Sequence, residues 1–344
     1  MNNDFSGNIP TSLGSLGFLR YLNLRNNKFH GQLPLSFGNL FNLVGLDVGK
    51  NNLSDVLPSW ELFALRYLIL RSNHFYGKIP TELCHCGQVL DLAMNHITGN
   101  IPRCFSNFTF IVTSINPSEH NPHVNVDNNV ILVDAKGSEL AYTTTSELLF
   151  SINLSNNNIS GEIPEELMDL HWLLSLNLAG NHLSGRIPGK IGKLEKLEFL
   201  DLSRNELYGA IPQSLSYLNF LSHLNLSFND LTGRIPDGNQ LQTLNDPSVY
   251  VGNKHLYGGP ILEPFPKGTD SNGFRDNSKA DIFSDDEHMW LYAGIGPGLL
   301  VGFLGFCGSL HFIKSWRYFY FHNLELVFNK LAVSIALFQR KFRN

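Results

Sequence analysis

The sequence predicts a solenoid of short tandem repeats, followed by one helix that crosses a membrane. The first observation is a series of nine prolines that close the phrase Asn-x-apolar-x-Gly-x-apolar-Pro, with Asp55 once in place of the glycine. They stand at Pro10, Pro34, Pro58, Pro80, Pro102, Pro164, Pro188, Pro212 and Pro236, with spacings of 24, 24, 22, 22, 62, 24, 24 and 24 residues. A fixed period of this length is typical of a solenoid. The second observation is the uncharged segment 290–313.

One full repeat shows what each position does. It reads Leu16-x-x-Leu19-x-x-Leu22-x-Leu24-x-x-Asn27-x-Phe29-x-Gly31-x-Leu33-Pro34. The Leu-x-Leu alternation predicts a short strand with one buried face, so that each repeat adds one strand to a parallel sheet. The asparagine points inward and needs hydrogen-bond partners, which the backbone of stacked turns can supply. The glycine permits a turn, and the proline starts an extended segment on the convex side.

These motifs resemble the plant-specific leucine-rich repeat, whose mark is the ending Gly-x-Ile-Pro, as in Gly99-Asn100-Ile101-Pro102. The resemblance covers residues 1 to about 236. It implies a leucine-rich repeat solenoid with a parallel β-sheet on the concave face and irregular or 3-10 segments on the convex side.

Composition narrows the function. The formal net charge of −5 leaves no basic surplus for nucleic acid, and no catalytic, cofactor or metal constellation stands out. We therefore expect no enzyme, no cofactor and no nucleic-acid partner. Cys84 and Cys104 fall in consecutive turns and could form a disulfide, whereas Cys86 occupies an apolar position and is expected in the core. Asn-x-Ser/Thr sequons, which are glycosylation candidates, occur at Asn52, Asn107, Asn153, Asn158 and Asn225.

The segment 290–313 predicts a single transmembrane helix, because 24 uncharged residues would span about 36 Å as a helix. Its outer flank is acidic, and the following tail is basic, so the positive-inside rule places the repeats outside the cell. Gly294, Gly298 and Gly302 form a stripe that would let another helix approach closely. The alternative is the ordinary abundance of glycine in membrane helices.

The gap between Pro102 and Pro164 holds 38 residues more than one repeat. An insertion of this kind is expected on one face of a solenoid, often the binding face, with a passive loop as the alternative. The predicted organisation is repeats over 1–102, the insertion over 103–148 and four repeats over 149–236. These are followed by a degenerate cap over 237–268, an acidic linker over 269–289, the helix over 290–313 and a basic cytoplasmic tail over 314–344.

Together, these parts resemble a plant receptor-like protein, with close matches at Ser151-Ile152-Asn153-Leu154-Ser155-Asn156-Asn157 and Gly238-Asn239-Gln240-Leu241. The match is greatest to the microbe-sensing group, such as xylanase receptors. The resemblance implies a plasma-membrane glycoprotein that binds an extracellular protein or peptide and signals in plant defence. Its kinase activity would come from a partner receptor kinase that pairs through the membrane helix.

Two departures leave other functions open. The chain begins partway through a repeat, and Tyr257 stands where the family's cap has a cysteine. The alternatives are a truncated receptor, non-functional or able to titrate a partner, and a repeat-type inhibitor of a secreted microbial enzyme.

Residues beside the strand leucines are expected on the concave face, because side chains alternate along a strand. Tyrosine and arginine are enriched at binding hot spots. The predicted ligand contacts are Tyr21, Asn23, Arg25, Asp47, Lys50, Tyr67 and Arg71. The family resemblance implies that the more uniform later repeats form a co-receptor docking surface, with Phe199, Asp201 and His223. The alternative for the ligand contacts is an ordinary solvated face.

Overall fold

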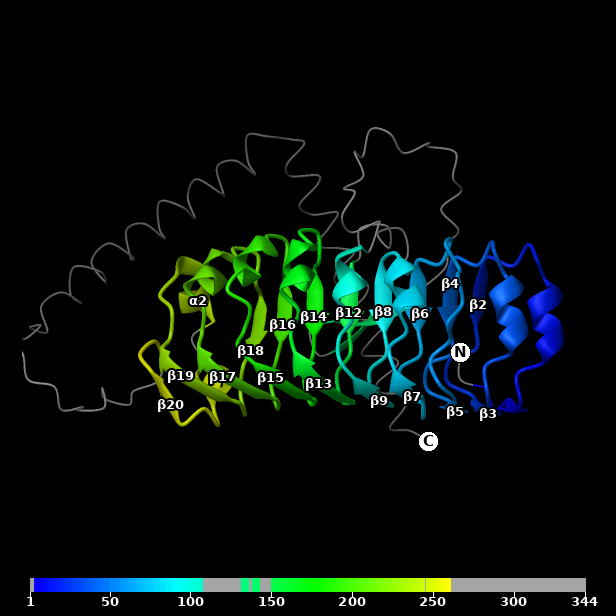
Figure 1. The fold of residues 1–344 in the computed structure, drawn as a ribbon, viewed down its shortest axis with the longest axis horizontal. Coiled ribbons are helices and arrows are strands. Elements are labelled where there is room, and N and C mark those ends of the chain that lie inside the picture. The colour runs from blue at the N-terminus through cyan, green and yellow to red at the C-terminus, as the bar shows by residue number, and fades with distance from the viewer. Residues whose placement is uncertain (1–2, 108–130, 136–137, 143–149, 245, 261–344) are drawn as a thin grey trace, which may run out of the picture. The chain divides into compact units, whose positions relative to one another are not determined.

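A computed structural model describes residues 3–107, 131–135, 138–142, 150–244 and 246–260. These residues all belong to the first of two compact units, Met1–Lys267. They form a solenoid of stacked turns with two sheets that run along it and short helices on a further side (Figure 1).

The longer sheet has eight parallel strands, one from each turn, and we call it the long sheet. Its strands are β2 (Tyr21–Asn23), β4 (Gly45–Asp47), β6 (Tyr67–Ile69), β8 (Val89–Asp91), β12 (Ser151–Asn153), β14 (Ser175–Asn177), β16 (Phe199–Asp201) and β18 (His223–Asn225). Strand β8 pairs directly with β12, with Leu90 opposite Ile152. The predicted insertion therefore leaves the stack of turns continuous.

Each turn also contributes to a second set of strands, which the sequence analysis did not predict. Seven of them form a parallel sheet: β7 (Tyr76–Lys78), β9 (His96–Gly99), β13 (Asn158–Glu162), β15 (His182–Gly185), β17 (Glu206–Ala210), β19 (Asp230–Arg234) and β20 (His255–Tyr257). The first turns form a separate three-stranded sheet from β1 (Ser6–Gly7), β3 (Lys28–Gly31) and β5 (Asn52–Leu53).

The three-stranded and seven-stranded sheets are separated at the third turn, whose sequence lacks the usual glycine. Most turns have a glycine here, such as Gly31 with φ +81° and Gly77 with φ +82°, but Asp55 replaces it in the third turn. A side chain disfavours positive φ, and Asp55 does not adopt it. An isolated bridge between Val56 and Tyr76 links the two sheets, and His74 N donates to Leu53 O beside it.

The convex side carries the expected 3-10 helices, most of which start directly after the repeat proline. They are η1 (Thr11–Ser15), η2 (Leu35–Asn39), η3 (Thr81–His85), η4 (Arg103–Asn107), η6 (Glu165–Asp169), η7 (Ile191–Lys193) and η8 (Gln213–Tyr217). In the insertion, β10 (Ile131–Ala135) and β11 (Ser138–Tyr142) pair in antiparallel fashion. The repeat leucines, with Phe37, Phe75 and Phe105, fill one continuous core between sheets and helices.

The inward asparagines find the partners predicted for them. Asn181 illustrates the pattern: its Nδ2 donates to Leu154 O at 3.0 Å and Leu178 O at 3.1 Å, and its Oδ1 accepts from Ile159 N at 3.0 Å. Equivalent bonds recur from Asn27 to Asn229, so the asparagines tie each turn to the one before it.

The cap that follows the last repeat has the same asparagine bonding, although it lacks the cysteines of the family's cap. It comprises α2 (Asn239–Thr243), η9 (Pro247–Tyr250) and β20. Asn253 donates to Leu226 O at 3.0 Å and accepts from Leu231 N at 3.0 Å, as a repeat asparagine would. The Tyr250 side chain is fully buried and belongs to the core.

A disulfide joins Cys84 of η3 to Cys104 of η4, with their Cα atoms 5.7 Å apart. Cys86 lies in the core, where burial raises the pKa of its thiol to about 12. Among the described residues, no helix has both the length and the apolar character needed to cross a membrane. The predicted span 290–313, with Gly294, Gly298 and Gly302, lies outside those residues.

Candidate ligand-binding face

The strand register aligns the candidate residues in two rows. The first row, through the first residue of each strand, is Tyr21, Gly45, Tyr67, Val89, Ser151, Ser175, Phe199 and His223. The second, through the third residue, is Asn23, Asp47, Ile69, Asp91, Asn153, Asn177, Asp201 and Asn225. Both rows point away from the leucine core, because the leucine between them points into it. We call this surface the outer face.

The first half of the outer face has an apolar cluster of its own. Tyr67, Ile69 and Val89 are buried there, with Tyr21 and Val44 packed against them. Gly45 makes the close packing of the tyrosines possible, since a Cβ at this position would lie 2.8 Å from the Tyr21 ring. Tyr21 and Tyr67 thus come from different turns but share one cluster.

Two ion pairs lie beside this cluster. Arg25 Nη1 is 3.6 Å from Asp47 Oδ1, and Arg71 Nη1 is 3.5 Å from Asp91 Oδ2. All four side chains are buried. Burial raises the pKa of Asp47, although Arg25 and a bond from Gly49 N act in the opposite direction. The predicted contacts Arg25, Asp47 and Arg71 are therefore brought together, but as partners within the fold.

Gly49 provides the space for these charges. A Cβ on Gly49 would lie 2.7 Å from Arg25 Nη1, 3.1 Å from Asp47 Oδ1 and 3.3 Å from Arg71 Cγ. Lys50, the next residue, is exposed and has φ +54°, which places it after the strand rather than in either row.

Exposure varies along the outer face. At its start, Tyr21 is half-buried and Asn23 is exposed. In the middle, Val89 and Ser151 are at most 1% exposed. Within the described part of the chain, Ser151 Oγ and Asn153 Nδ2 are buried without a hydrogen-bond partner. The middle of the face is thus largely inaccessible to solvent.

The last strands present a smaller cluster. The rings of Phe199 and His223 stack with centroids 4.4 Å apart, and Asn225 Nδ2 lies 3.4 Å from Asp201 Oδ2. Burial lowers the pKa of His223, while Asp201 acts to raise it. The predicted docking residues Phe199, Asp201 and His223 are therefore adjacent; Asp201 and His223 are half-buried and Phe199 is buried.

The described sequon asparagines differ in exposure. Asn52 and Asn158 are exposed, Asn225 is half-buried, and Asn153 is buried in β12. The side chain of Asn107 lies outside the described residues.

Comparison with known proteins agrees with the repeat pattern. The Leucine Rich Repeat family profile matches residues 18–40, 64–86, 88–108, 148–170, 172–194, 196–218 and 220–245. No curated protein matches the sequence.

Three solved plant structures are similar. The first is the ectodomain of the Arabidopsis thaliana receptor kinase GASSHO1/SCHENGEN3 with CASPARIAN STRIP INTEGRITY FACTOR 2, at 31% identity and a TM-score of 0.61, covering 76% of this chain and 27% of that one. The second is the Arabidopsis receptor kinase HAESA with the peptide hormone IDA and the co-receptor SERK1, at 31% identity and TM-score 0.57, covering 74% and 37%. The third is a plant ice-binding protein, at 25% identity and TM-score 0.52, covering 76% and 81%.

The chain thus spans 27% and 37% of the lengths of the two receptor structures. Since the third structure has a different role, the shared scaffold alone does not determine what is bound. The described residues form a leucine-rich repeat solenoid of the kind found in the ectodomains of plant membrane receptors.

Proposed function

We propose that this protein is a non-catalytic, extracellular recognition protein that binds a peptide or protein ligand on the first half of the outer face. The observation that carries the proposal is the contrast along that face. Aromatic and charged side chains occupy β2 to β8, whereas β12 and β14 carry serine and asparagine. Tyrosine and arginine are the residue types that most often dominate binding energy.

The two ion pairs give the predicted contacts different roles in this proposal. Tyr21, Asn23 and Lys50 are accessible enough to touch a ligand directly. Arg25, Asp47 and Arg71 are buried partners, which with Tyr67 would hold the surface beneath the ligand. A preorganised surface binds more tightly because less entropy is lost on binding.

The similar receptors support a protein or peptide as the ligand. GASSHO1/SCHENGEN3 and HAESA were each solved with such a partner, and HAESA also with a co-receptor. By analogy, we propose that the cluster of Phe199, Asp201 and His223 docks a co-receptor. On the sequence resemblance to microbe-sensing receptor-like proteins, we further propose a plasma-membrane location, a partner receptor kinase reached through residues 290–313, and a role in plant defence.

Position-specific photo-cross-linking tests the ligand surface. A photoreactive phenylalanine analogue would replace Tyr21 on β2 or, as a matched control, Tyr208 on β17 of the second sheet. Each full-length variant would be irradiated with the peptides secreted by plant tissue, and adducts would be identified by mass spectrometry. We expect one recurrent peptide adduct at position 21 and none at position 208. Adducts only at position 208, or the same adducts at both, would refute the proposed surface.

A further inference from the structure

The long sheet is bonded differently at its last strand. In each turn from β2 to β16, the carbonyl of the residue just before the strand accepts a hydrogen bond from the backbone of the next turn. Arg20 O accepts from Val44 N and Gly45 N, and Glu198 O accepts from Ser222 N and His223 N. The same holds for Val44, Arg66, Gln88, Phe150 and Leu174.

Strand β18 lacks this continuation. Its equivalent carbonyl, on Ser222, receives no backbone bond from the described residues of the cap. Two donors would be expected here by register, Asp246 N and the residue at 247, which is a proline without an N–H. Among the described residues, Asp246 N makes no bond to this carbonyl either. The chain instead turns into η9, with Asp246 Oδ1 accepting from Ser248 N at 2.9 Å.

The ladder resumes two residues further along. Leu226 N donates to Val249 O at 2.8 Å, and Phe228 N donates to Val251 O at 2.7 Å. Backbone groups of alternate residues point to the same side of a strand, so the N–H and C=O of Leu224 face the cap as well. They make no bond to the cap within the described residues. In the described part of the chain, the backbone edge of β18 that faces the cap is therefore unpaired from Ser222 to Leu224, and it is hydrogen-bonded to the cap from Leu226 onward.

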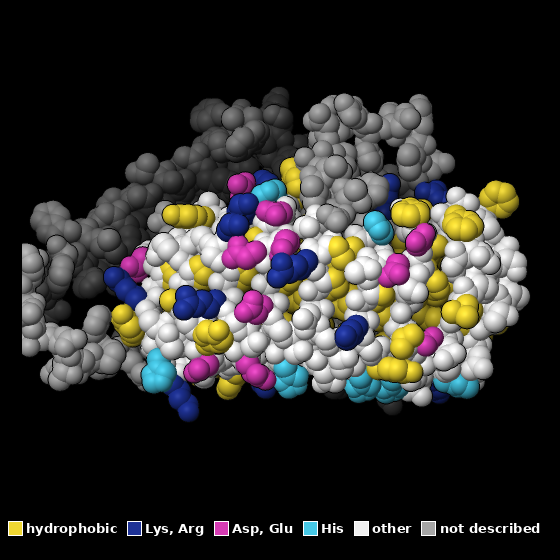
Figure 2. All heavy atoms as spheres, viewed as in Figure 1, with side chains coloured by type: hydrophobic (Ala, Val, Ile, Leu, Met, Phe, Trp, Pro, Cys, Tyr) yellow, Lys and Arg dark blue, Asp and Glu magenta, His cyan; other side chains and the backbone are white. Residues whose placement is uncertain are grey.

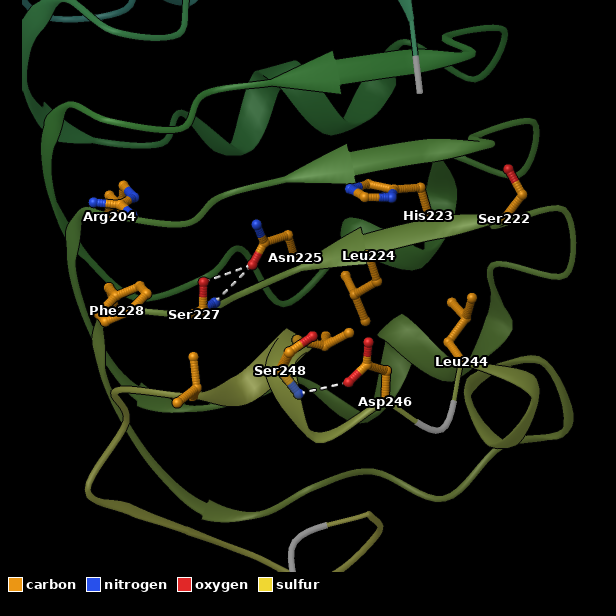
Figure 3. Close-up of a pocket in the computed structure, with 12 residues that line it drawn as sticks. Arg204, Ser222, His223, Leu224, Asn225, Ser227, Phe228, Leu244, Asp246 and Ser248 are labelled. Atoms are coloured by element: carbon orange, nitrogen blue, oxygen red, sulfur yellow. Dashed lines mark hydrogen bonds between the residues drawn. The ribbon is translucent and has the colours of Figure 1, made fainter. Parts of the chain in front are cut away.

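A cavity of 490 Å³ lies beside this open edge. Ser222 and Leu224 line one side, Asp246 and Ser248 line the other, and Arg204 and Phe228 lie at the closed end (Figure 3). The Arg204 guanidinium is 5.0 Å from the centroid of the Phe228 ring. An acidic side chain, Asp246, thus stands beside Ser248 on the cap side of the groove, and a basic one, Arg204, lies at the end with Phe228.

We propose that this groove binds an extended segment of a partner protein, which pairs with the edge of β18 as an additional strand. The segment would donate a backbone N–H to Ser222 O and exchange backbone bonds with Leu224. Its charges would complement the groove, with a basic side chain near Asp246 and an acidic side chain near Arg204. Strand addition obtains affinity from main-chain bonds and specificity from side chains, and the short open edge limits pairing to about three residues.

This site is independent of the ligand surface on β2 to β8, and it can be tested without knowing the natural partner. The probe is a library of random seven-residue peptides displayed on phage and selected on the immobilised full chain. Selected peptides would then be measured against S248W, which fills the groove. The matched control is S12W, because Ser12 is also an exposed serine at the second position of a 3-10 helix.

We expect selected peptides to carry a basic residue before an acidic one, and to bind S248W at least tenfold more weakly than wild type or S12W. Replacing the amide that donates to Ser222 O by an ester should weaken binding about fivefold, whereas an ester at the next position should not, because its group faces away. Peptides selected on R204Q should no longer favour the acidic residue, and peptides selected on D246N should no longer favour the basic one. Failure to recover any peptide, equal binding by S248W, or equal sensitivity to both esters would overturn the proposal.

Discussion

At the scale of single residues, the buried asparagines hold the turns together more than any other polar group. Replacing Asn181 by alanine leaves Ile159 N–H without its acceptor. It also removes one of two side-chain donors to Leu154 O and to Leu178 O, which keep those from Asn157 and Asn205. A buried group without a partner costs about 1–3 kcal/mol, so we expect N181A to lower the unfolding free energy by about 2 kcal/mol or more. Urea unfolding followed by circular dichroism measures this.

Asn158 supplies the control for that variant. It is an exposed asparagine on the same solenoid, at the start of β13. N158A should therefore leave the unfolding free energy within about 0.5 kcal/mol of wild type. Equal midpoints for N181A and N158A would show that the asparagine ladder contributes little to stability.

Gly49 tests the packing of the buried charges. A Cβ there would approach Arg25, Asp47 and Arg71 within 3.3 Å, and the two guanidinium groups have little room to move because they are buried. We expect G49A to lower the unfolding free energy by about 1–3 kcal/mol, as other overpacked sites do. Gly189, whose added Cβ would meet nothing within 4 Å, is the control. If G49A unfolds at the same denaturant concentration as G189A, the charge cluster is not tightly packed.

Residue spacing predicted the scaffold well and the charge cluster poorly. Leucine, asparagine, glycine and proline recur because each turn repeats the same backbone, so their roles could be derived from one repeat. The pairing of Arg25 with Asp47 depends on two neighbouring turns and on the space at Gly49. The repeat register could have indicated this pair, since Asp47 lies one turn after Asn23 in the same row.

At the scale of elements, the second sheet was missed for a related reason. Segments such as His182–Gly185, whose only apolar side chain is Leu183, are a weak strand pattern in isolation. They become strands because the long sheet has already stacked the turns in register. Gly185 and Gly209 have positive φ within these strands, and this could not be predicted without knowing the neighbouring turn.

The stacked pair on β16 and β18 should make stability depend on pH. Burial lowers the pKa of His223 below its ordinary value of 6.5, an effect larger than the opposing attraction of Asp201. The folded state then binds fewer protons than the unfolded state, so stability falls as pH drops through about 6.5 toward the lower folded pKa. We expect H223F to remove this contribution while keeping a ring over Phe199.

Unfolding curves at pH 7.5 and pH 5 provide the measurement. Wild type should lose more stability than H223F between the two values, because only wild type must protonate a partly buried imidazole. Identical losses in the two proteins would mean that the environment of His223 does not favour its neutral form.

At the scale of the whole molecule, charge is distributed unevenly along the solenoid. Side chains of both signs intersperse over the later turns, where Lys190 pairs with Glu165 and Lys193 with Asp169 between adjacent turns (Figure 2). Exposed apolar side chains occur in both halves, among them Phe18, Phe41 and Phe63 in the earlier turns and Trp172, Tyr217 and Phe220 in the later ones. Interturn ion pairs between these charged residues, rather than apolar exposure, therefore distinguish the later turns.

Glycan attachment tests whether the repeats enter the secretory pathway. An oligosaccharide needs an accessible asparagine, and among the described sequons Asn52 and Asn158 are exposed whereas Asn153 is buried. We expect the full chain expressed in plant cells to lose mass on treatment with a glycosidase. N52Q and N158Q should each reduce the loss, and N153Q should not. A chain with no mass loss in any form would contradict the extracellular location on which the receptor proposal depends. A loss that only N153Q abolishes would instead mean that the glycan is added before β12 joins the long sheet.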